Sequence, residues 1–560
     1  MSELHPALPF FVAAVLAALL RGMPRAVVML AVPLLGAYNL WAMGPGVVLP
    51  VSFLDYDLVP LRIDDLSILF GYLFHLAAFI AVVFALHVKD SLQHTAALTY
   101  VGGALGAVFA GDLLTLFVFW EIMAVSSAFL IYARRTARAY SAAMRYFIIH
   151  VLSGVLLLAG ALFTLRGTGS LAFNELGLAG PAGWLIFIAF GIKCAFPFLH
   201  NWLTDAYPEG TPTSTVFLSA FTTKVAVYAL ARGFPGTELL IYVGAAMTCF
   251  PIFYAVIEND LRRVLAYSMI NQIGFMVVGV GIGTALSING AVAHAVNDVI
   301  FKGLLLMAMG AVLYRTGRIN GSDLGGLYKT MPKTTVLCIV GAASISAFPL
   351  FSGFVSKSMV MTAALKEGYD WVWLCLLFAS AGVFHHAGIK IPYFAFFAHD
   401  SGIRASEPPL NMLLAMCIAA VLCIAIGCFP QALYSLLPFG VDYSAYDTTH
   451  VLAQLQLLFF SALAFVWLNL RGLYPPELRS VNIDVEWLYR KLLPAAVRDA
   501  LGVLAPVYRG FINGLRALLT ALTKPLVDHH GPQGVLARAW PIGSMVLWVA
   551  VLLGFYLIFL

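Results

Sequence analysis

The stretch Phe187-Ile-Ala-Phe-Gly-Ile-Lys193-Cys-Ala-Phe-Pro197-Phe198 places a lysine and a proline inside an otherwise apolar run. Such a run belongs in lipid, where a charged side chain near the bilayer centre costs roughly 2.5 to 3.5 kcal/mol. Pro197 lacks a backbone donor and frees a carbonyl, so it predicts a helix that is broken inside the membrane. A broken helix beside a buried charge is typical of transporters.

The rest of the chain has the same apolar character. Of its 560 residues, 61% are hydrophobic and 11% are charged, and the mean hydropathy is +0.92. Soluble domains carry about 25% charged residues. Apolar runs of about 20 residues, the length that a hydrocarbon core of roughly 30 Å requires, recur along the chain. We therefore predict an all-α membrane protein.

We predict about 16 transmembrane helices from these runs. Their expected starts lie near residues 7, 26, 66, 94, 113, 141, 183, 212, 239, 264, 287, 334, 371, 411, 452 and 543. Lys and Arg collect in alternate connections, and such connections lie in the cytoplasm. We expect a multi-pass protein of a bacterial or archaeal cell (inner) membrane, with both termini on the non-cytoplasmic side.

Two segments resemble one another at a separation of 149 residues, namely Gly154 to Arg166 and Gly303 to Arg315. They belong to the sixth and eleventh predicted spans and so cross the membrane in opposite directions, as inverted transporter repeats do. A chance match of Leu and Ala is the alternative. The predicted parts are 1–92 with spans one to three, 93–235 as the first inverted five-helix repeat, 236–400 as the second, 401–472 with spans fourteen and fifteen, 473–541 as an amphipathic lateral helix, and 542–560 as the final span.

The lateral helix is predicted because basic residues alternate with Leu, Val and Phe between residues 473 and 541. That pattern suits a helix lying in the membrane interface. An ordinary cytoplasmic linker is the alternative.

Six charged residues stand inside predicted spans, and we expect them to relay protons. They are Glu121, Lys193, Lys224, Lys302, Lys357 and Lys390. Burial disfavours the charged form of a lysine, whereas a nearby carboxylate favours it, so a lysine with a mobile acidic partner can gain and lose a proton. His294 and Asp298 extend this set, because with Lys302 they repeat every four residues and face one side of a helix.

The spacing also predicts which lysines are equivalent. Lys224 follows Lys193 by 31 residues, and Lys390 follows Lys357 by 33 residues. On the inverted-repeat hypothesis, Lys193 therefore pairs with Lys357, and Lys224 pairs with Lys390.

Structural roles are the alternatives for these residues. Lys193, Lys224, Lys302 and Glu121 could form plain ion pairs, and Lys357 and Lys390 could extend to the membrane surface. Four histidines are expected to be hydrogen-bonded polar residues, and three aspartates are expected to anchor helix ends. They are His150, His200, His385 and His386, and Asp112, Asp205 and Asp260.

The sequence predicts neither a cofactor nor a metal. The seven cysteines lie in apolar segments without a CxxC spacing, so we interpret them as small core residues. The chain has no GxGxxG, Walker, HExxH or GxSxG motif in a suitable context. Its net charge of +5 is spread over many short loops, which gives no sign of nucleic-acid binding.

Five motifs together resemble the antiporter-like subunits of respiratory complex I, membrane-bound hydrogenases and Mrp-type cation/proton antiporters. The resemblance spans roughly residues 60 to 400 and is greatest to the D-type subunits of the Mrp antiporters. The motifs are Phe117-Val-Phe-Trp-Glu121, Gly191-Ile-Lys193 through Phe198 to Asp205, Asp260-Leu-Arg-Arg-Val-Leu-Ala-Tyr-Ser268, His294 to Lys302, and Phe348-Pro-Leu-Phe-Ser-Gly-Phe-Val-Ser-Lys357.

The resemblance implies that Glu121 and Lys193 form a coupled pair and that Lys224 connects it onward. It further implies that Lys302 and Lys357 complete a hydrophilic axis along the membrane midplane. Asp298 departs from the pattern, because several members have histidine there, which puts the relay in that span in doubt.

The resemblance leaves three functions open. The first is an ion-translocating subunit of a multisubunit Na+/H+ antiporter, with protons and Na+ or K+ as its ions and other membrane subunits as partners. The second is a proton-pumping, non-redox subunit of an NADH dehydrogenase or hydrogenase complex, so we expect no catalysis by the chain alone. The third, a purely structural subunit, is disfavoured by the complete set of lysines.

Overall fold

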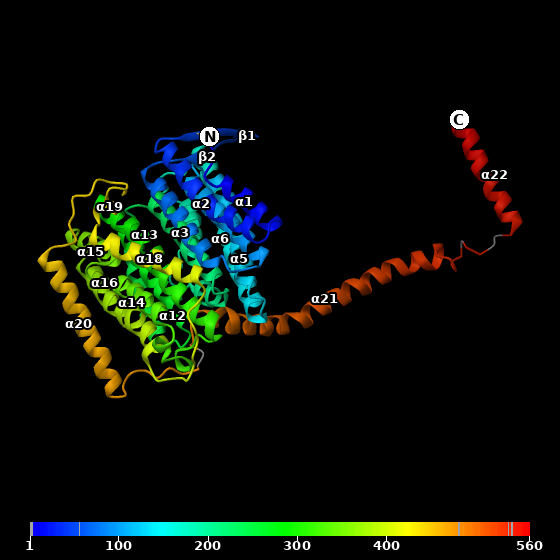
Figure 1. Ribbon diagram of the computed structural model, residues 1–560. Coiled ribbons are helices and arrows are strands. Elements are labelled where there is room, and N and C mark those ends of the chain that lie inside the picture. The colour runs from blue at the N-terminus through cyan, green and yellow to red at the C-terminus, as the bar shows by residue number, and fades with distance from the viewer. Residues whose placement is uncertain (1–3, 55, 480–481, 536, 539–540) are drawn as a thin grey trace. The chain divides into compact units, whose positions relative to one another are not determined.

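The computed structural model describes residues 4–54, 56–479, 482–535, 537–538 and 541–560. The chain forms two compact units, Met1–Asn482 and Ile483–Leu560. Apart from one β-hairpin, the regular structure of the described residues is helical (Figure 1). The protein is a multi-pass membrane protein, because twelve helices of the described residues are long and apolar enough to cross a bilayer.

The first unit begins with two helices, a hairpin and a third helix. These elements are α1 (Leu8–Leu19), α2 (Met23–Met43), β1 (Val48–Phe53), β2 (Tyr56–Arg62) and α3 (Asp65–Ala85). The two strands pair antiparallel with an irregularity between Leu49 and Val51. Asp64 caps α3 by accepting a 2.9 Å hydrogen bond from the Ser67 backbone N–H, and Arg232 Nη2 lies 2.7 Å from the same carboxylate.

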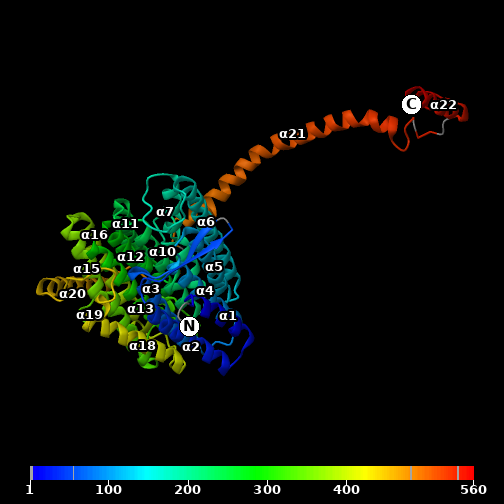
Figure 2. The same cartoon turned by 90° about the horizontal axis from the view of Figure 1, so that it is seen from above.

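The central helices follow in two groups, which Figure 2 shows on opposite sides of the first unit. The first group is α4 (Ser91–Phe109), α5 (Leu113–Tyr132), α6 (Ala137–Thr168), α7 (Pro181–Lys193), α8 (Asn201–Ala206), η1 (Tyr207–Glu209), α9 (Ser214–Ala220) and α10 (Thr222–Gly233). The second is α11 (Glu238–Ile257), α12 (Leu261–Ile282), α13 (Ala285–Thr316), η2 (Gly321–Asp323), η3 (Leu327–Lys329), α14 (Pro332–Ile345), α15 (Ser352–Lys366), α16 (Asp370–Val383), η4 (Phe384–Ile389), α17 (Lys390–Pro392) and η5 (Tyr393–Phe397).

Three more helices complete the first unit, namely α18 (Leu410–Cys428), α19 (Gln431–Tyr434) and α20 (Thr448–Leu470). A helix begins within four residues of each of the predicted span starts. Three of these helices, Leu8–Leu19, Pro181–Lys193 and Pro332–Ile345, are apolar but shorter than a full span. The total number of spans remains a prediction.

Two helices are broken at the same short motif. After α7, Ala195 and Phe198 flank Phe-Pro with φ of +61° and +68°, and after α14, Ala347 and Leu350 do so with φ of +57° and +73°. A non-glycine residue in this left-handed region costs about 1 to 2 kcal/mol. The breaks leave unpaired carbonyls that side chains can use. The predicted break at Pro197 is confirmed.

Several local features recur in the two groups at a separation of 148 residues. Asp112 caps α5 and Asp260 caps α12, and both aspartates form isolated β-bridges, with Ala172 and Asn320 respectively. Helices α6 and α13 each have a threonine cap and a left-handed glycine end at equivalent positions. The recurring separation is 148 residues where the sequence suggested 149. That the two groups are inverted repeats remains a prediction.

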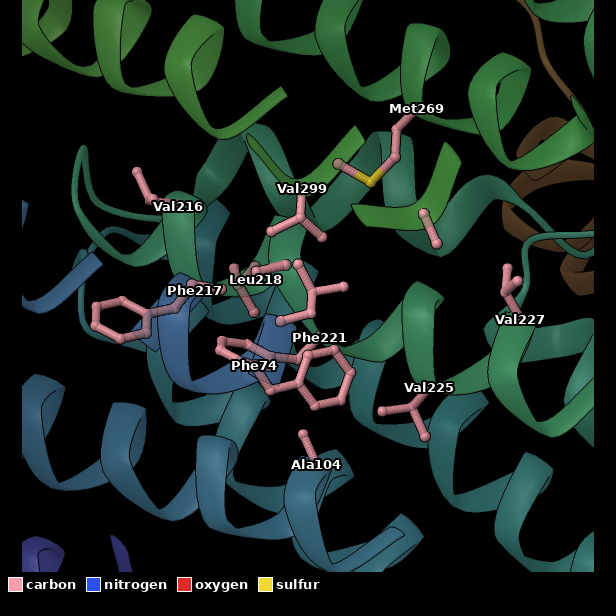
Figure 3. Close-up of a cluster of buried hydrophobic side chains, with 14 of the residues drawn as sticks. Phe74, Ala104, Val216, Phe217, Leu218, Phe221, Val225, Val227, Met269 and Val299 are labelled. Atoms are coloured by element: carbon pink, nitrogen blue, oxygen red, sulfur yellow. The ribbon is translucent and has the colours of Figure 1, made fainter. Parts of the chain in front are cut away.

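The junction of α9 and α10 lies within the hydrophobic core, which extends from Ala7 to Ala445. Phe221, between the two helices, packs edge-on against Phe74 at 5.2 Å and Tyr100 at 5.4 Å, and Figure 3 shows Phe74 and Phe221 side by side among buried Val and Leu residues. The Tyr100 hydroxyl accepts a 2.9 Å hydrogen bond from the Thr222 backbone N–H. These contacts stabilise the interruption between α9 and α10. They also hold the first turn of α10, which carries Lys224, in place.

The second unit contains η6 (Leu488–Leu492), α21 (Leu493–His530) and α22 (Ile542–Phe559). The 38 residues of α21 span about 57 Å at 1.5 Å per residue. The helix is amphipathic and has no buried residue among those described. It is shorter than the predicted segment 473–541, in which residues 480–481, 536 and 539–540 lie outside the described residues. Its place in the membrane interface remains a prediction.

Two of the three aspartates predicted as helix-end anchors cap a helix, and the third forms an ion pair with a neighbouring helix. Asp112 and Asp260 cap α5 and α12, and Asp205 on α8 pairs with Arg145 at 2.7 Å. The cysteines are less uniform than predicted, because Cys417 and Cys428 are exposed on α18. A small apolar thiol on the outer face of a membrane helix needs no protein partner.

Replacing Asp112 with alanine should destabilise the fold. The Asp112 carboxylate accepts hydrogen bonds from the Thr115 backbone at 2.7 Å, the Thr115 hydroxyl at 2.6 Å and the Val59 backbone at 2.8 Å. Loss of a helix cap costs about 0.5 to 2 kcal/mol, so the thermal midpoint of the purified protein in detergent should fall. Asp442→Ala, in an exposed loop, is the control, and an equal midpoint for both variants would contradict the expectation.

Candidate functional site

The first charged cluster lies where α5 and α7 meet. Lys193, the last residue of α7, is fully buried, and its Nζ donates a 2.6 Å hydrogen bond to the Trp120 carbonyl. The same ammonium lies 4.2 Å from the centroid of the Trp120 ring, within cation–π range. Glu121, the next residue on α5, interacts electrostatically with Lys193. The break at Ala195 ends α7 here and thereby places the lysine at a helix end.

Gly154 on α6 provides the space for the Glu121 carboxylate. A Cβ at residue 154 would overlap Glu121 Oε1, and this oxygen has no hydrogen-bond partner among the described residues. Glu121 is only half-buried and lines a surface groove of about 500 Å³ between α4 and α5. The carboxylate can therefore be reached both by Lys193 and by a molecule that occupies the groove.

His150 on α6 belongs to the same cluster. It is fully buried, stacks on Tyr146 at 3.9 Å and packs edge-on against Trp202 at 4.5 Å. Neither ring nitrogen has a hydrogen-bond partner among the described residues, and the ring lies within electrostatic range of Lys193. The prediction of a hydrogen-bonded structural histidine is therefore wrong in this part of the chain.

The second cluster is built on an ion pair between the two groups of helices. Lys224 Nζ on α10 lies 2.6 Å from Asp298 Oδ2 on α13, and both side chains are fully buried. Lys224 also donates to the Ser219 carbonyl at 3.2 Å. Asp298, the residue that departs from the family pattern, is thus the direct partner of a predicted relay lysine.

Lys302 extends this cluster along α13. It is fully buried and donates a 2.8 Å hydrogen bond to the Ser268 hydroxyl on α12. It lies within electrostatic range of both Asp298 and Lys224. Asp298 is therefore ion-paired with Lys224 and also lies within electrostatic range of Lys302.

His294 has a complete hydrogen-bond network. Its Nε2 lies 3.0 Å from Gln272 Oε1 and its Nδ1 lies 3.0 Å from Ser356 Oγ. Asn297 donates to the same serine hydroxyl at 3.0 Å. Because the Gln272 oxygen can only accept, Nε2 carries the proton, and Ser356 links the ring to α15.

Lys357 lies one helical turn into α15, after the second break. It is 1% exposed, and its Nζ donates a 2.9 Å hydrogen bond to the Ile345 carbonyl, which the break leaves free. The ammonium also lies 5.1 Å from the Phe275 ring, and it interacts electrostatically with Lys302 and Asp298. Lys357 therefore joins the second cluster.

Lys390 forms a third cluster with a carboxylate that the sequence did not predict. It is fully buried, and its Nζ lies 2.8 Å from Glu477 Oε1. It also donates to the carbonyls of Val256 at 2.6 Å and Glu258 at 2.7 Å, at the end of α11. Burial raises the pKa of the Glu477 carboxyl, which the Lys390 ammonium partly offsets. Glu477 follows α20 in an irregular segment, so no helical periodicity marked it.

His386 lies between the second and third clusters. It is fully buried in the π-helical turn η4, and its ring lies against the backbone of Gly382, one helical turn earlier. The ring is within electrostatic range of both Lys302 and Lys390. His386 was predicted as a satisfied polar residue, and unlike His150 it has a backbone hydrogen-bond partner, Gly382.

The predicted relay residues thus divide into three clusters. They are Glu121 with Lys193, then Lys224, Asp298, Lys302, His294 and Lys357, and finally Lys390 with Glu477. Lys357 and Lys390 do not extend to the surface, because both are buried. Whether any of these groups relays protons is not decided by burial and remains a prediction.

The predicted equivalence of Lys193 and Lys357 is wrong. Lys193 ends the half-helix before the first break, whereas Lys357 lies in the half-helix after the second. At the recurring separation of 148 residues, Lys302 instead takes the position of Gly154, and Met269 takes that of Glu121.

A family model described as NADH:quinone oxidoreductase/Mrp antiporter, TM, matches residues 110–384, which contain the first two clusters. NADH-quinone oxidoreductase subunit N of Desulforudis audaxviator is 31% identical over 369 residues, which cover 60% of this chain and 73% of that protein. The chain belongs to this family. The match covers the first two clusters, whereas Lys390 and Glu477 of the third lie after it.

Two further relatives of the family have different names. Hydrogenase-4 component B of Escherichia coli is 27% identical over 68% of this chain, and the A-type Na(+)/H(+) antiporter subunit of Alkalihalophilus pseudofirmus is 30% identical over 66%. The chain spans 63% and 52% of the lengths of these two proteins.

Two solved structures share the fold. A chain of the Mrp complex from Dietzia sp. has a TM-score of 0.71 at 23% identity and covers 82% of this chain and 98% of its own length. A chain of the membrane-bound sulfane sulfur reductase, an archaeal respiratory membrane complex, has a TM-score of 0.72 at 22% identity and covers 99% of both chains. The family fold therefore accounts for the helical architecture.

Gly154→Ala should disturb the Glu121–Lys193 cluster without removing a charge. The new methyl group overlaps the Glu121 carboxylate, which has to turn toward the groove between α4 and α5. Ion transport in membrane vesicles should fall while the amount of protein in the membrane is retained. Gly303→Ala on α13 is the matched control, because an added Cβ there meets open space. Equal transport by the two variants would contradict the expectation.

The Lys224–Asp298 pair should show a large coupling energy. Removing one partner of a buried ion pair costs about 3 to 5 kcal/mol, whereas replacing both with apolar residues is often neutral. We expect Lys224→Met and Asp298→Leu each to lower the thermal midpoint, and the double variant to recover most of the loss. Additive losses in this cycle would show that the two side chains do not stabilise one another.

Proposed function

We propose that the chain is the proton-translocating subunit of a multisubunit Na+/H+ antiporter. The observation that carries this proposal is the buried Lys224–Asp298 pair at 2.6 Å, with Lys302 and Lys357 in electrostatic range of the same carboxylate. A plain structural pair needs one lysine. Several lysines that share one carboxylate form a set in which a proton added at one site alters the proton affinity of the next.

The mechanism would begin at Glu121. When its carboxylate is ionised, it favours the charged form of Lys193, and when it is neutralised or drawn away, Lys193 releases its proton more readily. His150 is within electrostatic range of Lys193. Cys194, the next residue along the chain after Lys193, is within electrostatic range of Lys224. The charge state of the first cluster would thus bias the second.

Partner subunits would act through the exposed side of Glu121. This carboxylate lines a surface groove that is otherwise apolar except for short hydroxyl side chains, and a half-buried carboxylate facing lipid is unfavourable. Homologues are subunits of multisubunit Mrp and respiratory membrane complexes. A neighbouring membrane subunit that covers the groove would both stabilise Glu121 and set its charge state.

A redox-driven proton pump is the second candidate. The fold of the sulfane sulfur reductase chain matches 99% of this chain, including α21 and α22, whereas the Mrp chain matches 82%. The same clusters would serve such a complex, in which other chains carry out the redox reaction. Copurification would separate the two candidates. Iron–sulfur or nickel proteins would support the pump, and only small hydrophobic subunits would support the antiporter.

Glu121→Gln and Lys193→Ala should each abolish ion transport. The assay is Na+-driven proton movement in everted vesicles that carry the chain with its native partner subunits. Assembly should survive, and the amount of assembled complex in the vesicles is measured in parallel. Glu175→Gln and Lys333→Ala, both in exposed positions, are the matched controls. Transport at the parent rate in either cluster variant would refute the proposed function.

A further inference from the structure

A cavity with mainly apolar walls leads from the buried Lys357 to the protein surface. It lies between α15, α16 and α20 and has a volume of about 340 Å³, enough for several water molecules at about 30 Å³ each. Lys357 and Phe354, at one end, are buried, whereas Lys366 and Thr449, at the other end, are exposed. The relay lysine of α15 is therefore connected to the exterior.

Two polar stripes line this cavity. Residues four apart on a helix share one face, and this spacing brings Ser358, Thr362 and Lys366 of α15 and His450 and Gln454 of α20 into its wall. The stripes meet where Thr362 Oγ1 lies 3.1 Å from His450 Nε2. A line of hydroxyl, imidazole and amide groups thus follows the cavity from the surface inward.

Asp447 fixes the orientation of His450. It caps α20 by accepting a 2.7 Å hydrogen bond from the His450 backbone N–H, and its other oxygen lies 2.7 Å from His450 Nδ1. Because Nδ1 is held by the carboxylate, Nε2 faces Thr362 and the cavity. Imidazole is the side chain suited to taking up and releasing protons near neutral pH.

The charges of the lining disfavour metal cations. Lys357, Lys366 and His450 are the ionisable side chains among the described residues that line the cavity. The Asp447 carboxylate, beside the opening, is already engaged by His450. A Na+ ion in this space would meet basic groups without a free carboxylate, whereas a proton can pass between neutral hydroxyl, imidazole and amine groups.

We propose that this cavity, the α15–α20 vestibule, is the mouth through which Lys357 exchanges protons, and not Na+, with the solution, with His450 as the proton carrier at its opening. The proposal rests on the proposed function. A proton from solution binds His450 Nε2, passes through the Thr362 and Ser358 hydroxyls or intervening water, and converts the Lys357 amine to an ammonium. Only N–H and O–H bonds form and break, and one proton reaches Lys357 for each proton taken from solution.

Transport assays test the role of the vestibule. His450→Ala removes the carrier, and Ala453→Trp fills the cavity from an exposed lining position. Each should lower proton transport in vesicles of the assembled complex by at least about tenfold. Gln456→Ala, exposed on the same helix and outside the cavity, is the control. Parent rates in both His450→Ala and Ala453→Trp would overturn the proposal.

Thiol labelling tests the charge of the vestibule independently of transport. Thr362→Cys should react with water-soluble methanethiosulfonates above the background of the seven native cysteines. The anionic sulfonatoethyl reagent should react about tenfold faster than the cationic trimethylammonium reagent, after each rate is divided by that with free mercaptoethanol. Lys366→Glu should reduce this ratio. No labelling, or faster labelling by the cationic reagent, would overturn the proposal.

The two proposals fail in distinguishable ways. If Glu121→Gln and Lys193→Ala retain transport, the proposed function is wrong. If those variants lose transport while His450→Ala, Ala453→Trp and the labelling ratio behave like the controls, the proposed function is supported. Proton exchange through the α15–α20 vestibule is then refuted.

Discussion

A lysine ammonium buried among membrane helices has to find its hydrogen-bond partners within the protein. This constraint organises the centre of the molecule. The carbonyls that accept from these lysines come mainly from places where helices end or break: Lys357 bonds to Ile345 at the end of α14, and Lys390 bonds to Val256 and Glu258 at the end of α11. Inside an unbroken helix most carbonyls already accept from the N–H groups of the next turn, and the Trp120 carbonyl of α5, which accepts from Lys193, is the exception here. The Ala-Phe-Pro break after α14 thus provides the hydrogen-bond acceptor of the buried Lys357 ammonium.

The two groups of central helices solve this problem differently. At the positions 120 and 268, separated by 148 residues, Trp120 and Ser268 each accept a hydrogen bond from a lysine. In the first group that lysine is Lys193 from α7, and Glu121 fills the space above Gly154. In the second, Lys302 stands at the position equivalent to Gly154 and supplies the ammonium from α13. Where the first group has Glu121 and Gly154, the second has Met269 and Lys302 at a separation of 148 residues.

Because of this asymmetry, the three charged clusters differ from one end of the set to the other. The first group carries its carboxylate at a surface groove, where a neighbouring subunit can act on it. The middle cluster shares Asp298 among several lysines, and the far side offers two ends, one at Glu477 and one at the vestibule beside Lys357. A change in charge at one end would therefore be transmitted through pairs of groups that lie on separate helices.

The sequence by itself determined the membrane class, the approximate start of a helix at each predicted span, the broken helix at Pro197 and the identity of the relay candidates. These follow from apolar runs, from proline chemistry and from the cost of a charge in lipid, all of which act locally along the chain. Only the tertiary structure decided the partners. Glu477 and Asp447 lie in irregular segments without periodicity, and the pairing of Lys224 with Asp298 joins residues from different helices. The unpartnered ring of His150 follows from the aromatic side chains that surround it. Contacts between distant segments depend on how helices pack, which a single sequence does not reveal.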